Sequence, residues 1–163
     1  MIRYFIDFEF MGFGGELISG AVVREDGSSI YLVQPNDVLS AMRASPDSDP
    51  WVLENVMPHL YNVPRSVPIT VQPKREWGPM IAAFLYQDDQ VPQIFADWMT
   101  DISDLMNLFV TGPGTGVPMN HQTHMVCLRH LDVYPTTLPG AIQHNAYWDA
   151  AALKHWLGEM EAK

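Results

Sequence analysis

Two acidic residues, Asp7 and Glu9, stand one residue apart in an otherwise apolar segment near the amino-terminal end of the chain. Alternate side chains of a β-strand share a face, so in a strand the two carboxylates lie together, with Cα atoms roughly 6.5–7 Å apart. A strand this apolar usually lies in the middle of a sheet, and two anions there repel each other unless a cation lies between them. The pair therefore predicts a cation site, with an exposed acidic strand face as the alternative.

A second group of carboxylates, Asp97, Asp101 and Asp104, begins where the apolar segment 93–98 is expected to pass from a strand into a helix. Ends of strands are where functional sites form in α/β proteins. Capping of the helix by Thr100 or Asp101, with Asp104 at the third position, explains the same residues equally well. This group therefore predicts either metal ligands or a helix cap.

A third group consists of His144 and Asp149. On a predicted helix Asp149 lies one turn from Ala146 and Leu153, so its side chain points partly toward the core. Burying an unpaired carboxylate costs several kcal/mol, and Asp149 is therefore expected to meet a cation. His144 falls at the start of the helix, where its imidazole can turn toward the same place. A structural His–Asp pair is the alternative.

The net charge of −10, with nine Lys and Arg scattered along 163 residues, argues against a protein that grips long nucleic acids. Such proteins carry basic patches because phosphate neutralisation drives their affinity. Bound cations can nevertheless reverse the local field of an acidic site. If the substrate is a nucleic acid, the charge predicts short and weakly held molecules.

The remaining composition predicts one cytoplasmic domain over 1–163. No apolar run approaches the roughly 18–20 residues that span a bilayer, and the amino terminus has no signal-peptide pattern, so no membrane association is expected. The single cysteine, Cys127, excludes an internal disulfide and suits a reducing compartment. It is expected to be a buried strand residue rather than a nucleophile.

Hydrophobic periodicity and turn residues predict the elements that position these groups. Strands are expected first at 3–10, 16–23 and 29–34, with a turn at 25–28 between the last two. Alternating elements follow, with helices over 51–60, 76–87, 101–110 and 145–162 and strands over 93–98 and 124–133. Asp49 is expected to cap the first of these helices, with Pro50 at its first position. A short helix within 37–50, an extended connector over 63–73 and a flexible glycine-rich loop over 111–116 complete a mixed α/β sandwich.

In this order, the three groups resemble the motifs of the DEDD exonucleases, in the subclass with a His five residues before the last Asp. Asp7-Phe8-Glu9 is similar to the first motif, Asp-x-Glu. Asp101, followed by apolar helix positions, is similar to the second motif better than Asp97 is, although the usual Asn or Gly-rich lead-in is missing. His144, Ala146 and Asp149 are similar to the third, His-x-Ala-x-x-Asp.

The segments 3–10, 16–19 and 51–60 look more narrowly like a small bacterial and phage exoribonuclease family typified by a mycobacterial member. Leu131-Asp132-Val133 also resembles oligoribonuclease and ribonuclease T relatives. The resemblance covers nearly the whole chain. It implies a ribonuclease H-like fold, an α/β structure with a mixed five-stranded sheet flanked by helices.

The resemblance further implies two Mg²⁺ or Mn²⁺ ions held by Asp7, Glu9, Asp101 and Asp149, with His144 as general base. The reaction would be 3′→5′ hydrolysis of single-stranded RNA or DNA ends, RNA being favoured, with release of nucleoside 5′-monophosphates. An endonuclease of the same fold, a catalytically silent nucleic-acid-binding module and an unrelated acidic α/β protein are the alternatives.

Two further expectations concern binding. Phe10 and Met11 directly follow the first motif and are expected either to stack on the terminal base or to serve as core residues. Relatives of this kind are often dimers, and the aromatic content of the chain permits a homodimer.

Overall fold

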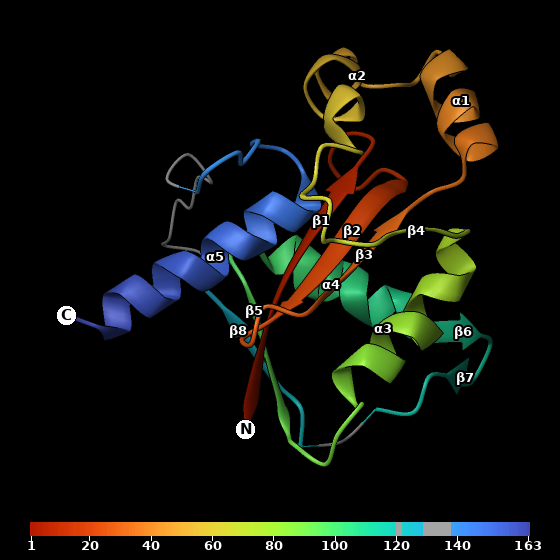
Figure 1. Ribbon diagram of the computed structural model, residues 1–163. Helices are drawn as coiled ribbons and strands as arrows, with labels where there is room; N and C mark the ends of the chain where they lie inside the picture. The colour runs from red at the N-terminus through yellow and green to blue at the C-terminus, as the bar shows by residue number, and fades with distance from the viewer. Residues whose placement is uncertain (120–121, 129–137) are drawn as a thin grey trace.

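Six strands form one mixed sheet among the residues that the computed structural model describes, which are 1–119, 122–128 and 138–163 (Figure 1). The sheet order is β4-β3-β2-β1-β5-β8. The pairs β1–β2 and β2–β3 are antiparallel, whereas β1–β5, β3–β4 and β5–β8 are parallel. The bounds are β1 Ile2–Phe10, β2 Leu17–Arg24, β3 Ser29–Val33, β4 Ile69–Val71, β5 Pro92–Ala96 and β8 His124–Cys127.

The predicted α/β class and mixed sheet are confirmed, but the expected count of five strands is wrong. The additional strand, β4, lies in the segment 63–73 that was expected to be an extended connector. Ile69-Thr70-Val71 are residues that favour strands, and they pair only with β3 at the edge of the sheet. The prolines of this segment led to the prediction of a connector. An edge strand tolerates nearby prolines, because one of its sides needs no hydrogen-bonding partner.

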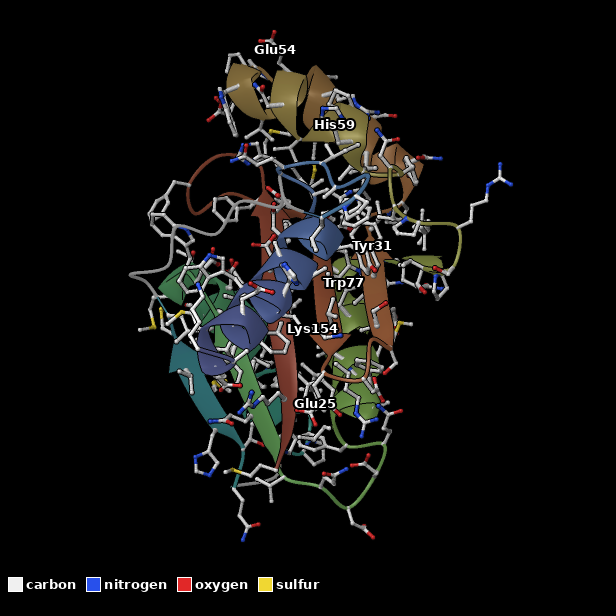
Figure 2. The ribbon with its side chains drawn as sticks, turned by 60° about the vertical axis from the view of Figure 1, so that its left-hand side comes forward. Glu25, Tyr31, Glu54, His59, Trp77 and Lys154 are labelled. Carbon is white, nitrogen blue, oxygen red and sulfur yellow. The ribbon has the colours of Figure 1, made fainter. Side chains whose placement is uncertain are left out.

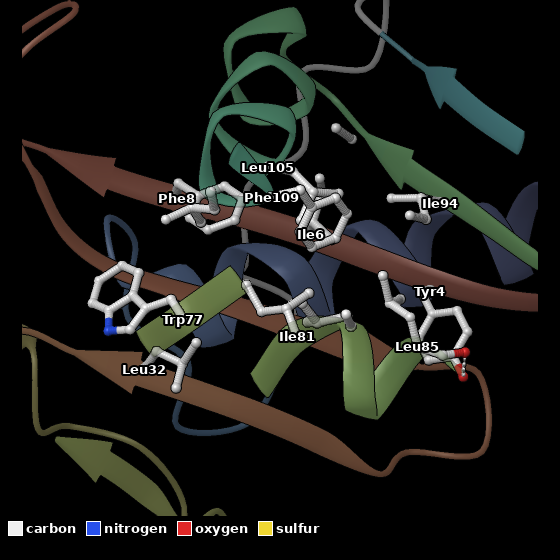
Figure 3. Close-up of a cluster of buried hydrophobic side chains, with 14 of the residues drawn as sticks. Tyr4, Ile6, Phe8, Leu32, Trp77, Ile81, Leu85, Ile94, Leu105 and Phe109 are labelled. Atoms are coloured by element: carbon white, nitrogen blue, oxygen red, sulfur yellow. Dashed lines mark hydrogen bonds between the residues drawn. The ribbon is translucent and has the colours of Figure 1, made fainter. Parts of the chain in front are cut away.

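Strand β1 lies in the middle of the sheet, between β2 and β5, as its apolar sequence predicts. Its even-numbered side chains, including Tyr4, Ile6 and Phe8, are buried against helices α3 (Trp77–Leu85) and α4 (Met99–Leu108) (Figure 3). Each buried side chain of this size contributes about 1.5–3 kcal/mol. This packing fixes the face to which the odd-numbered residues of β1 point.

Helices α3 and α4 approach each other closely at Gly78. A Cβ atom at this position would lie 2.0 Å from the backbone oxygen of Leu108, at the end of α4. Only a glycine fits such a contact. Gly78 therefore sets how closely α4, which carries Asp101 and Asp104, packs against α3.

The opposite face of the sheet is covered by the long helix α5 (Ala146–Glu161), which crosses β1 and β2 (Figure 1). Its own residues Ala146, Ala150 and Leu153 are buried. Asn145 caps the helix, since its side-chain oxygen accepts hydrogen bonds from the backbone N–H groups of Tyr147 and Trp148 at 3.1 and 3.4 Å. The predicted helix over 145–162 is confirmed.

The start of α5 is also held from the side. The side-chain amide of Asn145 donates to the backbone oxygen of His59 at 2.8 Å, and the Tyr31 hydroxyl donates to the backbone oxygen of Leu60 at 2.8 Å. Figure 2 shows Tyr31 and His59 near this end of the helix. Asn145 is fully buried, so these bonds fix the segment that carries His144.

The other helices agree with prediction in place and differ in length. They are α1 Asn36–Ala44 and α2 Pro50–Asn55, followed by the 3₁₀ turns η1 Met57–His59 and η2 Lys74–Glu76. The predicted cap of α2 is confirmed, because Asp49 accepts from the backbone N–H groups of Trp51 and Val52 at 2.8 and 3.4 Å. None of the helices in the described ranges is long and apolar enough to cross a bilayer.

Two local predictions are wrong. The segment 111–116 is not a plain loop, because β6 (Val110–Gly112) and β7 (Thr115–Gly116) form a small hairpin, with Gly114 at φ 69° in its turn. Neither Thr100 nor Asp101 occupies the N-cap position of α4, which is Trp98, since the helix begins at Met99. Of the predicted strand 124–133, residues 124–127 are confirmed, and Leu131-Asp132-Val133 lies outside the described residues.

Candidate metal centre

An acidic pocket of about 360 Å³ opens at the carboxyl-terminal end of β1. It is bounded by β1, by the junction between β5 and α4, and by the start of α5. Its ionisable lining residues are Asp7, Glu9, Asp97, Asp101, His144 and Asp149. The five residues that the three sequence motifs single out therefore lie in one pocket, together with Asp97, which had been considered only as a substitute for Asp101.

The potential ligand atoms form two groups. One carboxylate oxygen from each of Asp7, Asp97 and Asp101 lies within 4.8 Å of the other two. A second group joins carboxylate oxygens of Glu9 and Asp149 to a ring nitrogen of His144 within the same limit. Asp7 and Glu9, from one strand, thus contribute to different groups.

The register of the sheet explains why there is room for these groups. The parallel pairing of β1 with β5 ends at Phe5 and Phe95, so Asp7 and Glu9 extend beyond the paired part of β5. The backbone N–H of Phe8 donates to Oδ1 of Asp101 at 3.1 Å. Beyond the last pair of β1 and β5, the start of α4 therefore takes the place of β5 beside β1.

Asp101 is the most buried of the acidic residues, with 2% of its surface exposed. It is the third residue of α4, where a carboxylate can accept from the backbone N–H of the residue before the helix. Asp101 does accept from the N–H of Trp98, besides that of Phe8. A negative charge in the first turn also interacts favourably with the helix dipole. Asp101 thus joins α4 to β1.

His144 has a left-handed backbone conformation, with φ at 62°. Its ring meets the Trp51 ring edge to face, with centroids 4.8 Å apart and planes at 79°. Asp149, one turn into α5, accepts hydrogen bonds from the backbone N–H groups of His144 and Asn145. The imidazole is therefore held between an aromatic ring of α2 and the carboxylates of the pocket.

The electrostatics of the pocket are those of crowded, poorly solvated anions. Burial, followed by repulsion from neighbouring carboxylates, raises the pKa values of Asp7 and Glu9 well above their ordinary values. The pKa of Asp101 is likewise raised well above its ordinary value, by burial and then by Asp97. Burial is also the main cause that raises the pKa of Asp149 to about 7. A bound cation would remove the repulsion between these groups.

The pKa of His144 moves in the opposite direction. Burial lowers it, and the nearby His59 lowers it further. A histidine with a lowered pKa is neutral at pH 7 and keeps a ring nitrogen that can accept a proton. The pocket therefore combines acidic oxygen ligands with a neutral base.

The donor set fits Mg²⁺ or Mn²⁺. Both are hard cations that prefer carboxylate oxygens. Oδ2 of Asp7 is a buried atom that has no hydrogen-bond partner among the described residues. Leaving a buried carboxylate oxygen unpaired costs free energy, and a cation beside Asp7 would satisfy this oxygen.

Aromatic side chains surround the acidic pocket. Phe10 lines it, and its ring meets that of Phe13 edge to face at a centroid distance of 6.3 Å. Phe13 and Trp98 also line the pocket and are 85% and 55% exposed. Met11 is not a lining residue; it packs against the core beneath α1 and α2. Of the two expected substrate contacts, only Phe10 faces the pocket.

Sequence reasoning did not single out Phe13, Trp98 or Trp51. The glycines on both sides of Phe13 marked a turn that could expose its ring. Trp98 stands between Asp97 and the start of α4, so it was accessible to the same reasoning as its acidic neighbour. No local signal indicated that Trp51 meets His144.

The fold and the pocket together define an α/β protein with an acidic site suited to hard divalent cations. No protein-family model matches the chain, and no curated protein is significantly similar to it.

Proposed function

We propose that the chain is a metal-dependent 3′→5′ exonuclease that acts on short single-stranded ends, with RNA favoured over DNA. The observation that carries the proposal is the convergence of Asp7, Glu9, Asp101, His144 and Asp149 in one pocket. These residues come from three separate parts of the sequence. Their motifs were assigned from the sequence, through its resemblance to the DEDD exonucleases, and unrelated surface carboxylates have no reason to meet. The proposed fold is ribonuclease H-like, with β4 as an additional edge strand.

Asp7, Glu9, Asp101 and Asp149 would hold two Mg²⁺ or Mn²⁺ ions, as the resemblance implies. When bound, such ions lower the pKa of a water molecule and neutralise charge that develops on the phosphate. The carboxylates would fix the positions of the ions, and the phosphodiester, which is itself an anion, would be bound through those ions and not by the carboxylates directly. Hydrolysis at the last phosphodiester then releases a nucleoside 5′-monophosphate.

His144 acts as the general base in this proposal. Its ring nitrogen lies within 4.8 Å of carboxylate oxygens of Glu9 and Asp149, close to any water held between them. Its lowered pKa keeps the imidazole neutral at pH 7. Trp51 and the capped start of α5 fix the ring, so the proton acceptor stays aligned with the site.

The walls of the pocket favour a short substrate. No Lys or Arg is among the described residues that line it, so a long phosphate backbone gains little electrostatic attraction. The exposed rings of Phe13 and Trp98 instead offer surfaces on which bases can stack, worth roughly 1–3 kcal/mol per base.

The decisive experiment uses 5′-labelled RNA and DNA oligomers, with free or blocked 3′ ends, incubated with the protein and Mn²⁺. Stepwise shortening of the unblocked oligomers from the 3′ end is the expected result. Internal cuts in blocked oligomers would favour an endonuclease. Mn²⁺ binding without hydrolysis would favour a silent binding module, and absence of both would indicate an unrelated acidic protein. Size-exclusion chromatography of the same preparation tests whether the chain forms the homodimer that its aromatic content permits.

A further inference from the structure

Asp97 is the first residue after β5 and lies in the same ligand group as Asp7 and Asp101. We infer that Asp97 binds directly to the cation beside Asp7, as a fifth carboxylate of the metal site. This inference rests on the proposed function. It goes beyond the four-carboxylate set that the motif resemblance implies.

The sheet places Asp97 next to Asp7. Strands β1 and β5 run parallel, and their pairing ends at Phe5 and Phe95, two residues before Asp7 and Asp97 respectively. Asp7 and Asp97 therefore lie at equivalent positions along two neighbouring strands, each two residues beyond the last pair. The result is that their carboxylate oxygens, with one of Asp101, lie within 4.8 Å of one another.

The backbone at Asp97 is anchored on its other side by β8. The thiol of Cys127 donates a weak hydrogen bond to the backbone oxygen of Asp97 at 3.8 Å. Pairing of Ala96 with Cys127 continues the sheet up to this point. Asp97 is thus held at the end of the strand ladder and lines the pocket.

Asp101 is more deeply buried than Asp97 and is tied to the backbone around it. Its carboxylate accepts from the N–H groups of Phe8 and Trp98, and only 2% of the residue is exposed. Asp97 is only partly buried. Asp101 therefore both fixes the start of α4 and offers an oxygen from the buried side, and Asp97 adds an oxygen from the open side of the pocket.

A second observation points to a cation in this group. Oδ2 of Asp7 is buried and has no hydrogen-bond partner within the described part of the chain. In their ionised forms Asp97 and Asp101 only accept hydrogen bonds, so they repel an ionised Asp7 and give Oδ2 no partner. A divalent cation shared by the three residues gives each oxygen a partner, and such ions take about six oxygen ligands, including water.

The first test measures Mn²⁺ binding by calorimetry and by electron paramagnetic resonance of free Mn²⁺. Asp97→Asn is expected to weaken binding of one ion at least tenfold. The matched control is Asp104→Asn, which removes a carboxylate from α4 outside the pocket and is expected to bind Mn²⁺ as the wild type does. Wild-type binding in Asp97→Asn would overturn the inference while leaving the proposed function intact. Absence of Mn²⁺ binding in the wild type would overturn both.

The second test distinguishes a direct ligand from a nearby charge. Asp97→Cys, in a Cys127→Ala background that removes the only other thiol, places a soft ligand at this position, and thiolates prefer soft metals. With Cd²⁺ we expect a thiolate-to-metal charge-transfer band in the ultraviolet that the Cys127→Ala protein lacks. A correctly folded variant, judged by circular dichroism, that shows no such band would overturn direct coordination.

Discussion

Replacing Asp149 with Asn is expected to stabilise the metal-free protein while removing a metal ligand. Burial raises the pKa of Asp149 to about 7, against an ordinary value of 3.8. In the folded protein the ionised form is therefore unfavourable. The Asn side chain has nearly the same shape, and its oxygen can accept the same backbone N–H bonds from His144 and Asn145 without carrying a charge.

The magnitude follows from the two pKa values. One pH unit between them corresponds to about 1.4 kcal/mol, so the difference between 3.8 and about 7 amounts to on the order of 4 kcal/mol. The sign follows from linkage: between these values the folded state binds the proton more strongly than the unfolded state. The contribution of Asp149 to stability is therefore fully present below pH 3.8 and is lost as the pH rises to about 7.

The assay is urea unfolding of the wild type and Asp149→Asn in chelator, at several pH values from 4 to 8. The advantage of the variant should be near zero at about pH 4 and should approach on the order of 4 kcal/mol at pH 8. Mn²⁺ should narrow the difference, because a ligand at 100 times its Kd stabilises the wild type by about 2.7 kcal/mol and the variant binds it poorly. A variant that is less stable than the wild type at pH 8 in chelator, or an effect independent of pH, would refute the reasoning.

Three further predictions concern the proposed base His144, the contact between α3 and α4 at Gly78, and the exposed ring of Phe13 at the pocket. His144→Ala should reduce turnover at neutral pH at least a hundredfold while retaining Mn²⁺ binding by calorimetry; full activity would exclude His144 as the base. Gly78→Ala should lower the free energy of unfolding by about 3 kcal/mol, because its Cβ would meet the Leu108 carbonyl. Gly158→Ala, whose Cβ would contact nothing within 4 Å, should be neutral or slightly stabilising. Phe13→Ala should raise KM for an oligomer about tenfold with little change in kcat, in line with the energy of base stacking, and an unchanged KM would remove Phe13 from substrate binding.

The central position of β1 could be predicted from its sequence because the cause is local. An apolar strand that also carries Asp7 and Glu9 must be buried on both faces, and the structure has it between β2 and β5. The cap of α2 by Asp49 was equally local. Strand β4 was missed because its short run of β-formers lies among prolines, and its pairing with β3 depends on a segment 38 positions away, Ile69 against Tyr31.

The acidic group around α4 shows the limit of local reasoning more clearly. Asp97 and Asp101 were treated as alternatives, because the second motif of the resemblance contains a single Asp. The helix begins earlier, at Met99, and Asp101 points back to Phe8. That contact exists only because β1 and β5 stop pairing at Phe5, and no pattern in either segment records this register.

The positions of the pocket residues along the chain also have a consequence for biosynthesis. Translation produces Asp7 and Glu9 well before His144 and Asp149, which follow only with α5, the helix that packs across β1 and β2. Domains generally acquire structure as synthesis proceeds from the amino terminus. A nascent polypeptide that has reached β5 therefore carries only Asp7 and Glu9 of the proposed acidic ligands, and no base. On the proposed function, a partly made chain cannot degrade RNA, including the message from which it is being translated.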